Sequence, residues 1–68
     1  MMKRFFFDLQ GSQNIADCSG LLFETELAAF RSAERMAQEL SGARPELQGN
    51  TCVVVKRCAF DDGLYVSV

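Results

Sequence analysis

The fold is decided by one helical stretch, TELAAFRSAERMAQELSG, residues 25–42. Apolar side chains recur along it at the three- and four-residue spacing of an amphipathic helix, and charged side chains fill the opposite side. Thr25 favours the N-cap position, while Gly42 followed by Pro45 is typical of a helix end. The pattern therefore predicts one helix over residues 26–41. Its apolar stripe consists of Ala29, Phe30, Ala33, Met36, Ala37 and Leu40.

Residues 3–23, which precede this helix, contain two strand patterns. Residues 3–10 form the first strand, and alternation divides their side chains between two faces. One face carries Phe5, Phe7 and Leu9, and the other carries Arg4, Phe6 and Asp8. A return strand begins near Ile15 and leads out through residues 21–23. Between these parts, Asp17-Cys18-Ser19-Gly20 has Asp first and Gly fourth, as in a type I turn.

The segment after the helix is predicted to be a hairpin. Its first strand is the β-branched run of residues 51–59, and residues 64–68 form the partner strand. Asp61-Asp62-Gly63 suits a three-residue loop with the glycine in the left-handed conformation. A two-residue loop would shift the register by one, and both registers remain open. The longer loop pairs Phe60 with Leu64, Cys58 with Val66 and Lys56 with Val68.

The predicted fold class is α+β. The chain is expected to form a single domain over residues 1–68, in the order ββαββ. An antiparallel four-stranded sheet would carry the one helix packed on one face. The order in which the two hairpins join is not determined by the sequence.

A single helix covers only one face of such a sheet, which leaves apolar residues on the other. With the longer loop these residues are Phe6, Val53, Val55 and Tyr65. The shorter loop places Val54, Phe60 and Tyr65 there instead. Burial of such side chains stabilises by about 1.5–3 kcal/mol each, which is large for a small domain.

Three interpretations fit this face. Its apolar residues are scattered, or covered by residues 42–50, and have no role. They form a surface for homo-oligomerisation or protein binding. Or Phe6 and Tyr65 stack on RNA bases. We favour the second, with a homodimer or another protein as partner and with Phe6, Val53, Val55 and Tyr65 as the interface hypothesis.

The charge balance makes nucleic acid an unlikely partner. Seven Lys and Arg residues face nine Asp and Glu residues, for a net charge of −2. Nucleic-acid binders usually carry a concentrated basic surface, because phosphate contacts dominate their affinity. The rival hypothesis is a small regulatory protein whose dimer gathers the basic residues Lys3, Arg4, Lys56 and Arg57.

The residue types needed for most catalysis are missing. The chain has no histidine, which excludes Ser-His and Cys-His nucleophile pairs and imidazole metal ligands. It has no Cys-x-x-Cys and no glycine-rich phosphate loop. Asp61-Asp62 before Gly63 is typical of a turn rather than of a metal site. We therefore expect no enzyme activity, no cofactor and no metal.

The three cysteines are expected to be free and mostly buried. Their odd number leaves at least one thiol unpaired, and Cys52 and Cys58 would lie about 20 Å apart along one strand. Free thiols favour a reducing compartment. The apolar run at Phe5-Phe6-Phe7 is too short for a signal peptide or a membrane span. These features predict a cytoplasmic protein without membrane contact.

Short motifs along nearly the whole chain resemble a family of short, uncharacterised bacterial proteins, a domain of unknown function. The shared features are a Phe-Phe-x-Leu strand, an Asp-x-x-Gly turn, an Ala-rich helix and a C-terminal hairpin. They stand here as Phe6-Phe7-Asp8-Leu9, Asp17-Cys18-Ser19-Gly20, Ala28-Ala29-Phe30-Arg31, and Val53-Val54-Val55 leading towards Asp61 and Gly63. The resemblance implies the same architecture and brings no catalytic residues.

Overall fold

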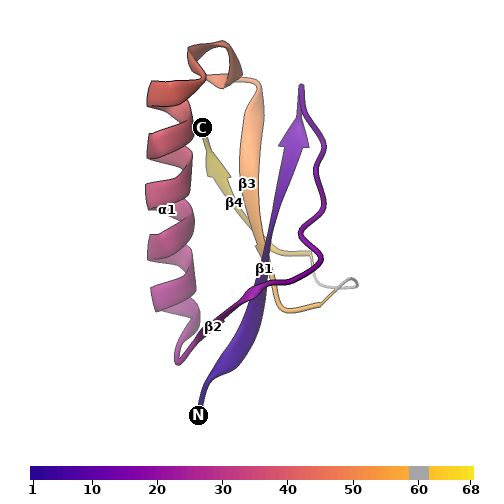
Figure 1. The fold of residues 1–68 in the computed structure, drawn as a ribbon, viewed down its shortest axis with the longest axis vertical. Helices are drawn as coiled ribbons and strands as arrows, with labels where there is room; N and C mark the ends of the chain where they lie inside the picture. The colour runs from indigo at the N-terminus through magenta and orange to yellow at the C-terminus, as the bar shows by residue number, and fades with distance from the viewer. Residues whose placement is uncertain (59–61) are drawn as a thin grey trace.

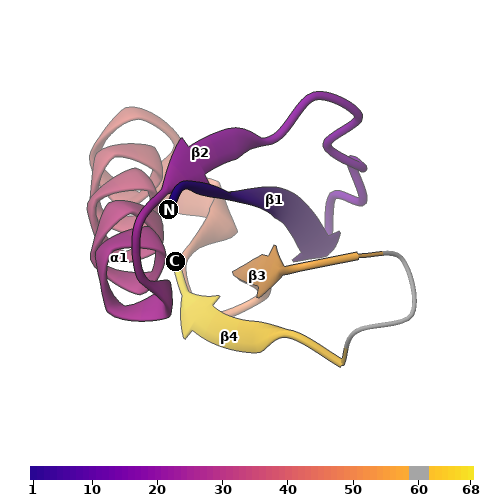
Figure 2. The same cartoon turned by 90° about the horizontal axis from the view of Figure 1, so that it is seen from below.

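One antiparallel sheet and one helix make up the chain in the computed structural model, which describes residues 1–58 and 62–68. The strands lie in the order β2-β1-β3-β4, and α1 runs along one face of the sheet (Figures 1 and 2). This confirms the ββαββ prediction, and the pairing of β1 with β3 settles how the hairpins join. The elements are β1 (Lys3–Gly11), β2 (Leu21–Phe23), α1 (Glu26–Ala43), the short 3-10 helix η1 (Pro45–Leu47), β3 (Thr51–Lys56) and β4 (Leu64–Ser67).

The helix begins as predicted but ends later. The Thr25 hydroxyl accepts a hydrogen bond of 3.1 Å from the Ala28 N–H, so Thr25 is the N-cap. The prediction that Gly42 ends the helix is wrong, because α1 continues to Ala43. A side chain at Gly42 would meet nothing within 4 Å, so this glycine is an open helical position. The helix ends because Arg44, which precedes Pro45, is forced out of the helical conformation (φ −133°).

The core is built from small helix side chains and large sheet side chains. Ala29, Ala33 and Ala37 of α1 are buried against Phe5, Val53 and Val55 of the sheet. Alanines let the helix lie close to the strands, where the larger side chains fill the space between them. Phe23 adds edge-to-face contacts with two rings of β1, with centroid distances of 6.1 Å to Phe5 and 5.9 Å to Phe7.

The predicted faces of β1 are confirmed, but the predicted hairpin register is wrong. Both predicted loop lengths require the first strand of the hairpin to continue to residue 59. The observed strand β3 ends at Lys56. The observed pairs are Val53 with Val66, Val54 with Tyr65 and Val55 with Leu64. This register sets apolar side chains opposite one another, which stabilises a strand pair more than Lys56 opposite Val68 would.

β3 therefore ends at Lys56 and β4 begins at Leu64, farther apart in the sequence than the predicted loop allows. The predicted pair of Phe60 with Leu64 includes a residue outside the described part of the chain. Gly63 takes the predicted left-handed conformation, with φ +79°. Its Cα lies against β3, since a Cβ there would come within 2.7 Å of Val54 Cγ1 and 2.9 Å of the Val55 carbonyl oxygen. Gly63 thus allows β4 to turn in closely beside β3.

The cysteines are free, as predicted, but they are not mostly buried. Cys18 and Cys58 are exposed, and Cys52 is half-buried. Cys58 is exposed because β3 ends two residues before it, which takes it out of the sheet. Within the described residues, no helix has the length and apolar character needed to cross a membrane.

Candidate association surface

The face of the sheet opposite α1 carries only part of the predicted interface. Phe6 and Tyr65 lie on this outer face, because their neighbours in sequence point towards the helix. Val53 and Val55 do not, and their predicted placement is wrong: they are 2% and 3% exposed in the core beneath α1. The cause is the register, which pairs Leu9 with Val53 and Phe7 with Val55 on the helix side. Val54 takes the outer position, as the shorter loop had suggested.

The chain itself covers part of this outer face. Gly20 lies over Phe6, close enough that a Cβ would come within 3.1 Å of its ring. Lys56 Nζ and Asp8 Oδ2 form an ion pair of 2.9 Å across β1 and β3. Val54 is fully buried at 0% exposure although it faces away from the helix. The outer face therefore offers less apolar surface than the sequence predicts.

Beyond the stretch that pairs with β2, the free side of β1 is closed by the residues between β1 and β2, and this stretch is called the closed edge. The Asp17 carboxylate accepts three main-chain hydrogen bonds of 3.1 Å, from Phe7, Ser19 and Gly20. Leu9 and Ile15 exchange a pair of main-chain bonds. The Gly11 N–H then donates to the Asn14 side-chain oxygen at 3.3 Å. The main-chain donors along this edge of β1 are thus satisfied within the chain.

Hydrogen bonds also keep the two carboxyls of this region ionised. The Gly20 N–H lowers the pKa of Asp17 most, and the Phe7 and Ser19 N–H groups add to the effect against a smaller opposing contribution from burial. Burial raises the pKa of Asp8, but the Asp17 N–H and Lys56 together outweigh it, so the pKa of Asp8 is lowered. Ionised Asp8 and Asp17 are therefore parts of the closed edge.

The other edge is strand β4, and it is open. β4 is the outermost strand on its side of the described chain (Figure 2). The sequence Leu64-Tyr65-Val66-Ser67-Val68 contains no charged residue and no proline, which are the usual protections of an edge strand. Leu64 is 40% exposed and Tyr65 58% exposed. An uncharged strand with exposed apolar side chains is a surface suited to association.

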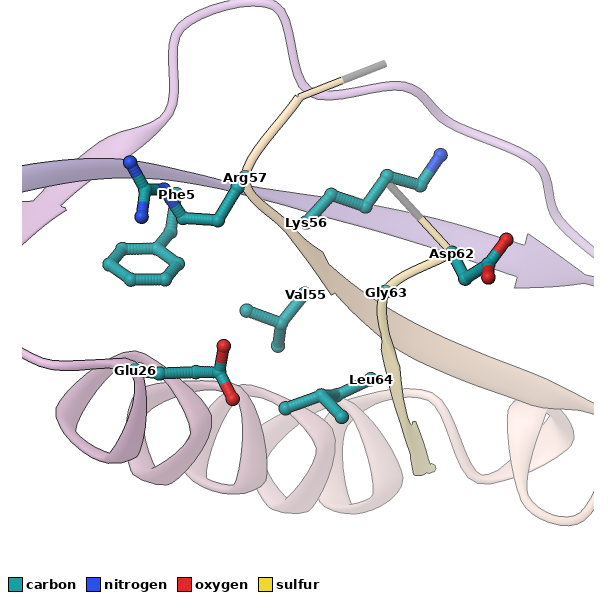
Figure 3. A pocket seen from close by; sticks show the side chains of 8 residues that line it. All are labelled: Phe5, Glu26, Val55, Lys56, Arg57, Asp62, Gly63 and Leu64. Carbon is teal, nitrogen blue, oxygen red and sulfur yellow. The ribbon is translucent and has the colours of Figure 1, made fainter. Parts of the chain in front are cut away.

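A small cavity lies at the start of β4 (Figure 3). Phe5, Val55 and Leu64 supply its apolar side chains, while Glu26 and Arg57 are among the charged side chains around it. Its volume of about 120 Å³ is well below the roughly 300–1,000 Å³ of usual small-molecule sites. The cavity is thus too small to hold a typical substrate.

An apolar groove opens between α1 and the second half of β1. β2 pairs with β1 at Lys3 to Phe5, and the groove lies beside the part of β1 that follows. The groove has a volume of about 360 Å³, and Glu39 is its one charged residue. It lacks the several convergent polar groups that orient a substrate. The remaining lining residues are Phe7, Leu9, Met36, Leu40, Ala43 and Val53.

Three basic residues of the rival hypothesis lie on the neighbouring strands β1 and β3, and Arg57 directly follows β3. Arg4, Lys56 and Arg57 contact groups of their own chain. Arg4 Nη1 donates to the Ser19 carbonyl oxygen at 2.7 Å. Lys56 pairs with Asp8. The Arg57 guanidinium lies 5.1 Å from the centre of the Phe5 ring, on the helix side of the sheet. These contacts divide the cations between two faces rather than gathering them into one phosphate-binding surface.

Comparison with known proteins supports the family resemblance and adds no activity. A family model described as a domain of unknown function (DUF6894) matches residues 4–62. No curated protein and no solved structure matches the chain.

Proposed function

The chain belongs to the DUF6894 family, a domain of unknown function, and from its own surface we propose that it is a non-enzymatic module that acts by associating with itself or with another protein. The observation that carries this proposal is the open edge at β4. The exposed large apolar side chains Leu64 and Tyr65 both lie on this strand, which is the last one on its side of the sheet among the described residues. Association would cover both.

The chemistry of the chain supports a binding role over a catalytic one. The sequence contains no histidine, and the described residues include no group of three or more His, Cys, Asp or Glu side chains placed to hold a metal ion. The Asp8 and Asp17 carboxyls are held by hydrogen bonds of the closed edge. A carboxyl that acts as a general acid or base must be able to reach a substrate proton, whereas these two are engaged within their own chain.

Sedimentation over a range of concentrations tests self-association. We expect the average mass to rise above 7.6 kDa between low and high micromolar protein. Tyr65→Lys should lower the mass at a given concentration, because it places a charge on the open edge. Leu22→Lys is the matched control, since Leu22 is 49% exposed but lies on β2, at the opposite end of the strand order from β4.

Two outcomes would contradict parts of this proposal. A constant mass of 7.6 kDa would remove self-association and leave only binding to another protein. Equal effects of Tyr65→Lys and Leu22→Lys would show that β4 has no special role. Titration with RNA and with duplex DNA at two salt concentrations tests the rival. We expect weak binding, whereas tight binding with a steep salt dependence would favour a nucleic-acid partner.

A further inference from the structure

We propose that the partner of the β4 edge is a second copy of this chain, bound antiparallel through β4 and centred on Val66. This inference rests on the proposed function and makes it specific. The two sheets would join into one sheet of about eight strands, related by a two-fold axis perpendicular to the sheet. Both helices would then lie on the same face.

The hydrogen-bonding direction of each β4 residue follows from its pairing with β3. The Val68 N–H donates to the Thr51 carbonyl oxygen at 3.0 Å. Because main-chain groups alternate in direction along a strand, Val66 and Leu64 also turn towards β3. The N–H and C=O groups of Tyr65 and Ser67 therefore point away from β3. Two residues thus present four main-chain groups along the open edge.

These four groups fit a symmetric register. When the two copies of β4 are centred on Val66, Tyr65 of each copy lies opposite Ser67 of the other. Each such pair exchanges two hydrogen bonds, so the interface gains four. A register centred on Tyr65 would bring Gly63 into the pairing, and Gly63 already interacts within its own chain.

The side chains of β4 match this register as well. On the helix side, Val66 would face Val66 of the second copy, and Leu64 would face Val68, so the contact is apolar. On the outer side, Tyr65 would face Ser67. Leu64 and Tyr65, both exposed in one molecule, would become covered. Because no β4 residue is charged, two identical strands meet without repulsion between like side-chain charges.

A proline substitution at Ser67 tests the edge. Ser67→Pro removes an N–H that points away from β3, so the β3–β4 bonds remain while two of the four intermolecular bonds are lost. We expect the dimer to weaken on the order of tenfold or more, measured by sedimentation. Ser67→Ala is the matched control and should dimerise like the original chain. A dimer that is equally strong in the Ser67→Pro variant would overturn pairing through β4, although self-association would stand.

Disulfide trapping tests the register and does not depend on the proline variant being folded. In a chain with Cys18, Cys52 and Cys58 changed to serine, Val66→Cys should crosslink rapidly under mild oxidation. Facing residues at such a site lie about 4.5 Å apart between Cα atoms, within the disulfide range. Tyr65→Cys is the control. It is more exposed, but residue 65 of one copy would lie about 8 Å from residue 65 of the other.

Each outcome of the trapping experiment is informative. Faster crosslinking through position 66 supports the proposed register. Faster crosslinking through position 65 would overturn it in favour of a Tyr65-centred pair, and equally slow crosslinking of a dimeric protein would place the interface elsewhere. A chain that stays monomeric throughout would overturn the pairing and leave association with another protein as the proposed function.

Discussion

The free side of β1 beyond β2 differs from the free side of β4 in how its main-chain groups are satisfied. Beside β1, the residues before β2 fold back so that Asp17 and Asn14 accept hydrogen bonds from the main chain of the strand. Along β4, Tyr65 and Ser67 present their main-chain groups outward. An edge that a chain closes with its own side chains is protected from pairing, whereas an unprotected edge is a template for another strand. This difference is the reason why we propose β4 as the place where this protein meets a partner.

The largest expected effect comes from enlarging Gly20 at the closed edge. Gly20 has φ +73°, and a Cβ there would lie 2.7 Å from the Phe5 carbonyl oxygen. Gly20→Ala therefore adds both left-handed strain and a main-chain clash, and we expect it to lower the free energy of unfolding by about 3 kcal/mol. Urea denaturation measures this loss.

Gly49 provides the matched control for that substitution. It has nearly the same conformation, φ +78°, but a Cβ there would meet nothing within 4 Å. Gly49→Ala should therefore show the conformational strain alone, about 1 kcal/mol. Equal losses in the two variants would mean that Gly20 is not pressed against β1.

Removing the Asp17 carboxylate should open the closed edge at somewhat smaller cost. Asp17→Ala leaves the N–H groups of Phe7, Ser19 and Gly20 without their acceptor, and we expect a loss of about 2 kcal/mol in denaturant unfolding. Asp17→Asn keeps one acceptor oxygen and should lose about 1 kcal/mol. If the alanine variant is no less stable than the asparagine variant, the carboxylate does not hold the edge.

Acid should weaken the closed edge through the same carboxyls. The pKa values of Asp8 and Asp17 in the folded chain lie below the ordinary value of 3.8. Their contribution to stability is therefore complete above about pH 4 and is lost as the pH falls through the lowered values. Because Asp17→Asn lacks one of these groups, its stability should approach that of the original chain as the pH falls below 4. A constant difference in stability would contradict this assignment.

The smallest expected effect is a difference in amide hydrogen exchange between β1 and β4, which can be measured without changing any residue. In dilute protein, the amide protons of Phe7 and Leu9 should exchange with solvent more slowly than those of Tyr65 and Ser67, because the former have partners at the closed edge. Raising the concentration should slow exchange at Tyr65 and Ser67 alone if β4 pairs with itself. Exchange measured by NMR at two concentrations provides the check, and unchanged rates would argue against pairing at that edge.

The helix and the first strand could be predicted because each has its own local pattern. The alanine stripe with the Thr25 cap and the alternation of Phe5, Phe7 and Leu9 require no knowledge of the rest of the chain. The end of the helix was missed because Gly42 is open to solvent and tolerated, so the restriction imposed by Pro45 decides. The Asp-x-x-Gly motif was visible in sequence, but its bond to Phe7 was not, because that bond joins two separate segments.

The register of the last hairpin could not be predicted because its first strand has no alternation. Val53, Val54 and Val55 are equivalent in a pattern of polar and apolar residues, so the sequence of Asp61-Asp62-Gly63 was the one local guide to the register. This loop sequence favoured a short loop. The observed register instead pairs the three valines with Leu64, Tyr65 and Val66. The position of β4 at the edge of the sheet could not be predicted either, because it depends on the order in which all the strands assemble.

The alanine stripe of α1 restricts how this family of sequences can change. Ala29, Ala33 and Ala37 set the distance between the helix and the sheet, so a larger residue at any of them would tilt or lift the entire helix. On the strands, substitutions among phenylalanine, valine and leucine can compensate one another in volume. They would move the backbone less than a larger residue in the alanine stripe would. We therefore expect substitutions to accumulate on the strand side of the core, while the helix side keeps its small residues.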